Sequence, residues 1–110
     1  MKSQHEFFPV TDVPWTDDGP GISQRLLSTS ATDTALTRIA RWSPGTVSGD
    51  AVIEHDYFEE VYLLEGSLTD LTLGTTFTAG DYAARRPGMP HGPYRTDDGC
   101  TMLETRYPVS

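Results

Sequence analysis

His-Asp-Tyr-Phe-Glu-Glu-Val-Tyr-Leu-Leu-Glu-Gly occupies residues 55–66 and predicts more about this chain than any other segment. It places an imidazole, His55, four residues before a carboxylate, Glu59, and then continues as an apolar run that ends at a glycine. A second imidazole, His91, lies in Arg-Pro-Gly-Met-Pro-His-Gly, residues 86–92. Two imidazoles and one carboxylate are a suitable ligand set for a divalent transition metal. The sequence therefore predicts a metal site made of these three side chains.

Strand alternation is the geometry that would bring the three ligands together. In an extended chain His55 shares one face with Ile53 and Tyr57, and Glu59 follows after a bend. Each residue alone has an ordinary explanation, because a single histidine in a β protein is more often a surface or core residue than a ligand. The ordered combination with its glycines is much more specific.

Short β segments separated by turn residues fill the chain after residue 21. No window carries a sustained apolar pattern of helical period. The predicted strands are residues 22–28, 34–42, 51–55, 59–65, 67–73, 75–78, 82–86, 91–95 and 100–107. We therefore predict one all-β domain, a sandwich or barrel, over residues 21–110. Residues 1–20, with aromatics between prolines, are predicted to form an extended arm that docks on its own barrel or on a neighbouring subunit.

Composition narrows the class of protein. The 110 residues suffice for one modest core. A net charge of −8 argues against nucleic acid and anionic membrane surfaces as partners, because both repel such a chain. The single cysteine, Cys100, cannot form an internal disulfide, and we expect it to be a buried small residue rather than a nucleophile. Residues 1–20 hold no apolar segment typical of a signal peptide or anchor, so we expect a cytoplasmic protein.

The first of these motifs resembles one of the cupin superfamily, in which a histidine, three or four residues, a glutamate, six residues and a glycine follow one another. His55, Glu59 and Gly66 have that spacing. The chain looks closest to the small ChrR-type cupins. The resemblance implies a double-stranded β-helix, the cupin jelly-roll barrel, over residues 21–107.

The second motif of the superfamily runs glycine, five residues, proline, one residue, glycine, two residues, histidine. Gly80, Gly88 and His91 match it, with Arg86 at the position of the proline and Pro87 after it.

The chain also departs from this family. The first histidine of the family falls on Ile53, and the asparagine of the second motif falls on Arg95. The usual three-histidine, one-glutamate set is thereby reduced to His55, Glu59 and His91. The reduced set is either a facial triad with open coordination positions or the relic of a lost metal site, and we favour the triad because an unpaired buried carboxylate is costly.

Aromatic and basic side chains beside the predicted ligands are candidates for a catalytic role. Tyr57 shares the strand face of His55, and Tyr94 follows His91. Alternation sends Arg85 and Arg86 to opposite faces, and an inward arginine suits a carboxylate or phenolate substrate. We assign Tyr57, Arg86 and Tyr94 as candidates, while both arginines being ordinary surface charges is an equal alternative.

The resemblance to cupin dioxygenases implies a non-haem Fe(II) enzyme that cleaves a diketone, hydroxyketone or phenolic substrate with oxygen. A non-oxidative isomerase, lyase or cyclase on the same metal is the alternative, and a non-catalytic small-molecule or metal-sensing cupin is a third hypothesis. One divalent ion per chain is expected, with Fe²⁺ favoured and Mn²⁺, Zn²⁺ or Ni²⁺ also suited to these ligands. We expect a homodimer, because chains this short often cover exposed sheet edges by pairing.

Overall fold

Two antiparallel sheets enclose one apolar interior in the computed structural model, which describes residues 1–32 and 34–109. This arrangement confirms the predicted all-β double-stranded β-helix. No helix among the described residues is long and apolar enough to cross a membrane. The elements are η1 (Val10–Asp12), β1 (Thr16–Asp17), β2 (Ile22–Thr29), β3 (Leu36–Trp42), β4 (Phe58–Asp70), β5 (Thr75–Thr78), β6 (Tyr82–Arg85), β7 (Tyr94–Arg95) and β8 (Cys100–Tyr107).

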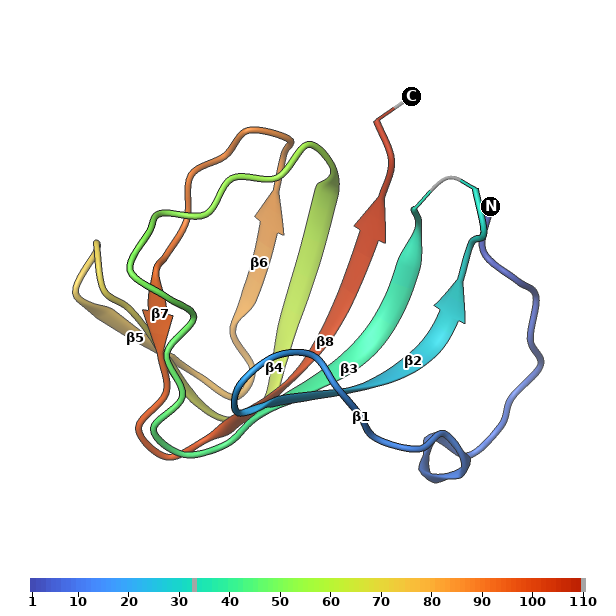
Figure 1. The fold of residues 1–110 in the computed structure, drawn as a ribbon, viewed down its shortest axis with the longest axis horizontal. Helices are drawn as coiled ribbons and strands as arrows, with labels where there is room; N and C mark the ends of the chain where they lie inside the picture. The colour runs from blue at the N-terminus through green and yellow to red at the C-terminus, as the bar shows by residue number, and fades with distance from the viewer. Residues whose placement is uncertain (33, 110) are drawn as a thin grey trace.

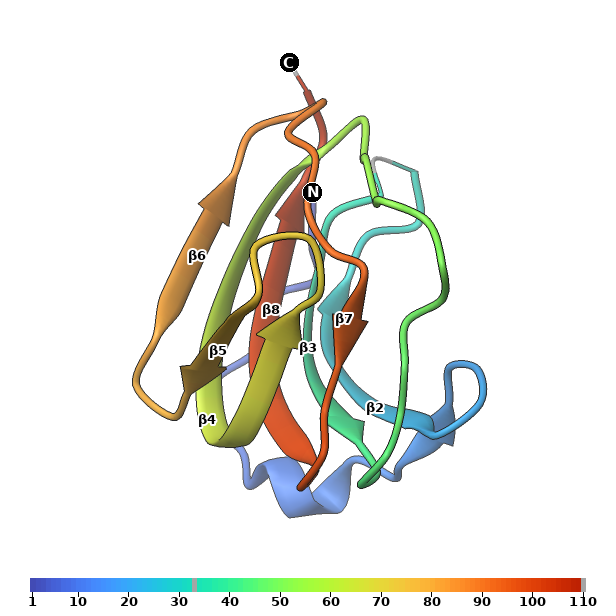
Figure 2. The same ribbon diagram turned by 90° about the vertical axis from the view of Figure 1, so that its left-hand side faces the viewer.

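The larger sheet has the strand order β1-β2-β3-β8-β4-β6, and it curves around the smaller sheet (Figure 1). The smaller sheet consists of β5, the end of β4 and β7, and Figure 2 shows it in front of the larger one. We call the side of the larger sheet that faces β5 and β7 its concave face, and the opposite side its convex face. The concave face carries the candidate site.

Strand β4 belongs to both sheets because it bends at Gly66 (Figure 1). Gly66 has φ 79°, and a Cβ there would lie 2.0 Å from the carbonyl oxygen of Gly99. Only glycine fits this position, since it tolerates positive φ and has no side chain to meet that oxygen. The two strands predicted over residues 59–65 and 67–73 are therefore one continuous bent strand.

The prediction of a strand over residues 51–55 is wrong. This segment runs beside the chain that precedes β7 but pairs with it at a single isolated bridge, Ile53 with His91. A second isolated bridge joins Val47 to Arg95 of β7. The predicted strand 91–95 is correspondingly reduced to Tyr94–Arg95. Ile53 and His91 exchange both backbone hydrogen bonds, at 2.7 and 3.0 Å, so their side chains project to the same face.

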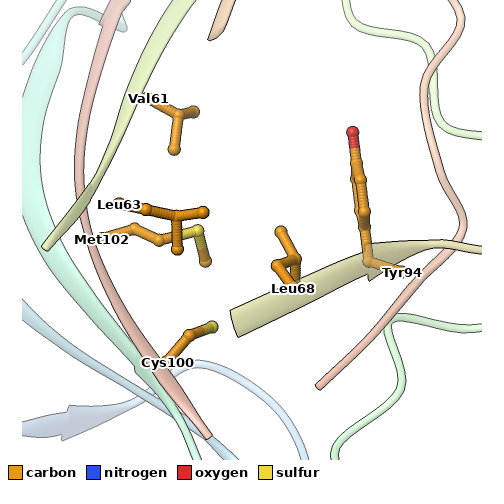
Figure 3. Close-up of a cluster of buried hydrophobic side chains, with 6 residues drawn as sticks. All are labelled: Val61, Leu63, Leu68, Tyr94, Cys100 and Met102. Carbon is orange, nitrogen blue, oxygen red and sulfur yellow. The ribbon is translucent and has the colours of Figure 1, made fainter. Parts of the chain in front are cut away.

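Alternation along β4 builds the core. Val61 and Leu63 are buried while Tyr62 and Leu64 are exposed. The buried side chains from β4, β7 and β8 point toward one another across the space between the sheets (Figure 3). The cluster consists of Val61, Leu63, Leu68, Tyr94, Cys100 and Met102. Cys100 is buried as expected, and burial raises the pKa of its thiol to about 11.

The N-terminal arm lies against its own larger sheet. The backbone N–H of Ser3 donates to Thr29 at the end of β2, and Lys2 Nζ donates to Thr37 Oγ1 on β3 at 2.6 Å. Further along the arm, the ring of Trp15 contacts the guanidinium of Arg41 at 3.9 Å. Strand β1 then pairs with β2, so the arm joins the sheet before residue 21.

Candidate metal centre

His55, Glu59 and His91 converge at one end of the concave face. Their ligand atoms all lie within 4.8 Å of one another. Glu59 comes from β4, His55 from the segment before it, and His91 from the turn before β7. A metal bound by all three would bring these atoms to about 3 to 3.5 Å apart, given bond lengths of about 2.0 to 2.2 Å.

Both imidazoles are held in a state that can bind a metal. Nδ1 of His91 lies 3.1 Å from the carbonyl oxygen of Met89, which fixes Nδ1 as the donor and leaves Nε2 free to ligate. His55 stacks on Tyr57 with ring centroids 4.5 Å apart. Burial lowers the pKa of His55 and of His91, so both rings stay neutral near neutral pH.

Glu59 is the most enclosed of the three ligands, with 3% of its surface exposed. It stands between two arginines in one cross-strand row, opposite Arg85 on β6 and Arg106 on β8. Arg85 Nη1 donates to Oε1 at 2.8 Å, and Arg106 Nε donates to Oε2 at 3.2 Å. The two guanidiniums offset the cost of burying the carboxylate charge. Each oxygen keeps a second lone pair, so Glu59 can still coordinate a metal.

These observations fit the predicted ligand set. Two neutral imidazoles and one carboxylate at this spacing suit a divalent transition metal held on one face, with further positions left open. A cluster that could hold a metal is therefore present at His55, Glu59 and His91, while the donor set does not distinguish Fe²⁺ from Mn²⁺, Zn²⁺ or Ni²⁺.

A cavity of about 390 Å³ borders the triad through His91. Its wall is mostly apolar and includes Val61, Leu63, Leu68, Phe77 and Met102. Arg85 and Tyr94 supply its polar end, where Arg85 Nη2 donates to the phenol oxygen of Tyr94 at 2.8 Å. Burial raises the pKa of Tyr94, which keeps its phenol protonated. The cavity thus offers space for a compact apolar molecule with one polar group.

The structure places two of the three predicted catalytic residues beside the triad. Tyr94 lines the cavity. Tyr57 stacks on His55, and the guanidinium carbon of Arg106 lies 5.2 Å from the centre of the Tyr57 ring. Arg86 is exposed beyond the end of β6, whereas Arg85 faces inward, so Arg85 occupies the position that the sequence prediction gave to Arg86. Alternation alone does not fix which of two adjacent arginines points inward.

Arg106 is the site residue that the sequence prediction missed. It shares a strand face with Cys100, Met102 and Glu104, and that alternation was visible in the sequence. Its contact with Glu59 depends on the pairing of β8 with β4, which joins residues far apart in the chain.

A second buried cluster lies on the same concave face, one row further along β8. Arg38 Nε donates to Glu104 at 3.1 Å, and Arg38 Nη1 donates to Gln24 at 2.7 Å and to Asp18. Burial raises the pKa of the Glu104 carboxyl, although Arg38 acts in the opposite direction. No histidine contributes to this cluster in the described chain.

The fold and site define a cupin. The sequence matches the family of ChrR cupin-like domains over residues 3–110, so the chain belongs to that family. No curated protein is similar enough in sequence to count as a relative.

Solved structures agree in fold. An RmlC-like cupin from Shewanella frigidimarina is 22% identical, with a TM-score of 0.77 over 98% of this chain and 94% of that one. An acetylacetone dioxygenase from Acinetobacter johnsonii is 20% identical, with a TM-score of 0.76 over 96% and 75%. The polyketide cyclase RemF from Streptomyces resistomycificus is 21% identical, with a TM-score of 0.71 over 96% and 81%.

Proposed function

We propose that this chain is a metal-dependent enzyme that cleaves a small diketone, hydroxyketone or phenolic molecule with oxygen, using Fe²⁺ held by His55, Glu59 and His91. The observation that carries the proposal is the position of the triad beside an apolar cavity whose polar end is Arg85 and Tyr94. The structural similarity to an acetylacetone dioxygenase supports this reaction type, since the two chains share the fold.

The charges around the triad favour a substrate that binds as an anion. Arg85, Arg106 and Glu59 together carry one net positive charge, and all three side chains are at most about one fifth exposed. A divalent ion adds two more positive charges in a site with little access to water. An enolate or phenolate would offset part of that charge, and this compensation would strengthen metal and substrate binding together.

Arg85 is the residue best placed to recognise the anion. It has five N–H groups, of which the bonds to Glu59 and Tyr94 use two. Because it lines the cavity, it can donate to a substrate oxygen while it still holds Glu59. Tyr94 orients the guanidinium, and the apolar wall excludes water from the reacting group. A bound divalent metal would supply a Lewis acid for a chelating oxygen ligand and, as Fe²⁺, a redox-active centre through which the substrate could give its electrons to O₂.

Oxygen uptake by the iron-loaded protein over a panel of small diketones, hydroxyketones and phenols tests this function. We expect uptake with at least one of them. Arg85→Gln should raise KM by about tenfold or more, because it removes a charge-assisted hydrogen bond from the substrate. Arg86→Gln is the matched control and should behave as wild type, since Arg86 is exposed. Tight binding of a panel member without any turnover would instead support a non-catalytic binding cupin.

A non-oxidative lyase or cyclase is the second candidate, supported by the similarity to the cyclase RemF. The same Arg85–Tyr94 pair would stabilise an enolate without any need for oxygen. Loss of substrate under strictly anaerobic conditions distinguishes this candidate from the oxidative one.

A further inference from the structure

The convex face of the larger sheet carries a row of apolar side chains that nothing in the described chain covers completely. This row crosses β3, β8, β4 and β6, which lie side by side in Figure 1. Neighbouring members are direct cross-strand partners, and the row consists of Ile39, Leu103, Tyr62 and Tyr82, in that order. Tyr62 is 44% and Tyr82 is 59% exposed, and Leu64 beside them is 40% exposed. Contiguous apolar side chains on one face are typical of an interaction surface.

The charged side chains that β3 and β4 present beside this apolar row are sorted by sign. On the β3 side, Lys2 binds Thr37 and Arg41 packs against Trp15. On the β4 side stand Glu60 and Glu65. The convex face therefore has a basic half on β3 and an acidic half on β4, with β8 between them.

The pairing register places these opposite charges in the same cross-strand rows. Arg41 and Glu65 both pair with Thr101 of β8, one from each side. Thr37, which holds Lys2, and Glu60 both pair with Thr105. Each acidic residue on β4 thus lies at the same height along β8 as a basic group on β3.

We propose that this face binds a second copy of the chain about a two-fold axis parallel to β8. Because β3 and β4 lie on opposite sides of β8, this axis places β4 of one subunit opposite β3 of the other and keeps each residue at the same height along β8. Arg41 would then face Glu65 of the partner subunit, and Lys2 would face Glu60 of the partner subunit. Tyr62 would pack on Ile39 of the partner subunit along the apolar row.

Charge excludes the other simple face-to-face arrangement. An axis perpendicular to the strands would place β4 on β4 and β3 on β3. With this axis along the apolar row, Glu60 would face Glu65 of the partner subunit and Arg41 would face Lys2 of the partner subunit. Like charges would then meet, which costs free energy at an interface. The sorted charges therefore select the axis parallel to β8.

Two features prepare this surface for binding. The phenol hydroxyls of Tyr82 and Tyr107 both donate to Glu60, at 2.5 and 2.7 Å, and fix the rings against the sheet. The ring of Trp15 lies 3.9 Å from the guanidinium of Arg41 and holds it on the basic half. Groups that are already ordered lose less conformational entropy on association. Removal of residues 1–15, which include Lys2 and Trp15, should accordingly weaken the dimer.

Exchange of charge between the two halves tests the arrangement. Sedimentation over a micromolar dilution series should give wild type about twice the chain mass of 12.1 kDa. Arg41→Glu and Glu65→Arg should each raise the dissociation constant of the dimer by about tenfold or more. Each substitution places two like charges opposite each other, and the two-fold axis repeats this contact. The double variant Arg41→Glu/Glu65→Arg should recover an affinity close to wild type, since it only exchanges the charges.

A matched pair of leucines controls for non-specific effects. Leu64, on the convex face, and Leu71, beyond the end of β4, are both 40% exposed. Leu64→Asp should give monomers, and Leu71→Asp should remain dimeric, with circular dichroism confirming that both fold. A monomeric wild type, a dimer insensitive to Leu64→Asp, or a double variant no tighter than the single ones would overturn the proposal.

Discussion

Two buried arginine–carboxylate clusters share the concave face of this protein, and they differ in what surrounds the carboxylate. Glu59 has an arginine on each side, and two imidazoles have ligand atoms within 4.8 Å of it. Glu104 pairs with Arg38, whose remaining contacts go to Asp18 and Gln24. We call these the Glu59 cluster and the Glu104 cluster.

The difference shows how the same ion-pair chemistry serves two purposes. In the Glu104 cluster the chain itself supplies the partners of Arg38, and neither Glu104 nor Arg38 lines the cavity. In the Glu59 cluster Arg85 and His91 face the cavity, and the ligand atoms of the triad remain available. We infer that the Glu104 cluster stabilises the sheet and that the Glu59 cluster binds metal and substrate.

The same substitution in both clusters should separate these roles most strongly. Glu59→Gln removes a charged metal ligand, so Fe²⁺ affinity should fall by more than about 100-fold, since even the loss of an outer partner can cost up to that amount. Glu104→Gln should leave the affinity within about threefold of wild type. Competition with a chromogenic chelator measures both. Equal losses would mean that the two clusters act as one unit.

Substitution of the arginines should give the opposite order in stability. Arg38→Met leaves Glu104 buried without its cation and frees two further acceptors, so the free energy of unfolding should fall by about 3 kcal/mol or more. Arg85→Met should cost less, because Arg106 still pairs with Glu59. Urea denaturation measures both variants. Arg95→Met is the control, and it should change the free energy by less than about 0.5 kcal/mol because its ion pair is exposed.

The sequence predicted the fold and the clustering of three candidate ligands, because its motif spacing resembles that of a known family and strand alternation is a local property. His55, Glu59 and His91 lie where that spacing requires. The arginines were not predictable in the same way. Whether Arg85 or Arg86 faces inward depends on the pairing of β6 with β4, and the contact of Arg106 with Glu59 depends on the pairing of β8 with β4.

The bend in β4 shows the same limit. A glycine between two apolar runs predicted a break, so residues 59–65 and 67–73 were assigned as separate strands. The backbone instead continues through Gly66, because this position packs directly on Gly99 of a distant segment. Such a contact has no signal in the local sequence.

Restoration of the histidine that the family has at residue 53 should sharpen the description of the Glu59 cluster. Ile53 pairs with His91 and projects to the same face, so Ile53→His should add a fourth ligand and raise metal affinity by about tenfold. Turnover should fall, because fewer positions remain open to substrate and oxygen. Glu54→His, at an exposed neighbouring position, is the control. Higher affinity without any activity to lose would indicate a relic site.

The smallest expected effect concerns the pH dependence of the Glu104 cluster. Because burial raises the pKa of Glu104, the folded state holds its proton to a higher pH than the unfolded state, whose value is near 4.5. Tighter binding of this proton stabilises the folded state. The stabilisation is fully present below pH 4.5 and is lost as the pH rises through the raised pKa of Glu104. Glu104→Gln should remove this slope, and urea denaturation over a series of pH values measures it. An unchanged slope would show that Glu104 does not cause it.

The central claim is that His55, Glu59 and His91 form a working metal site. Metal analysis after reconstitution with Fe²⁺, Mn²⁺, Zn²⁺ or Ni²⁺ and desalting tests it most directly, with His91→Ala and Glu104→Gln treated in parallel. We predict close to one ion per chain in wild type and in Glu104→Gln, and almost none in His91→Ala. Wild type that retains none of the four metals, or His91→Ala that retains as much as wild type, would contradict the claim.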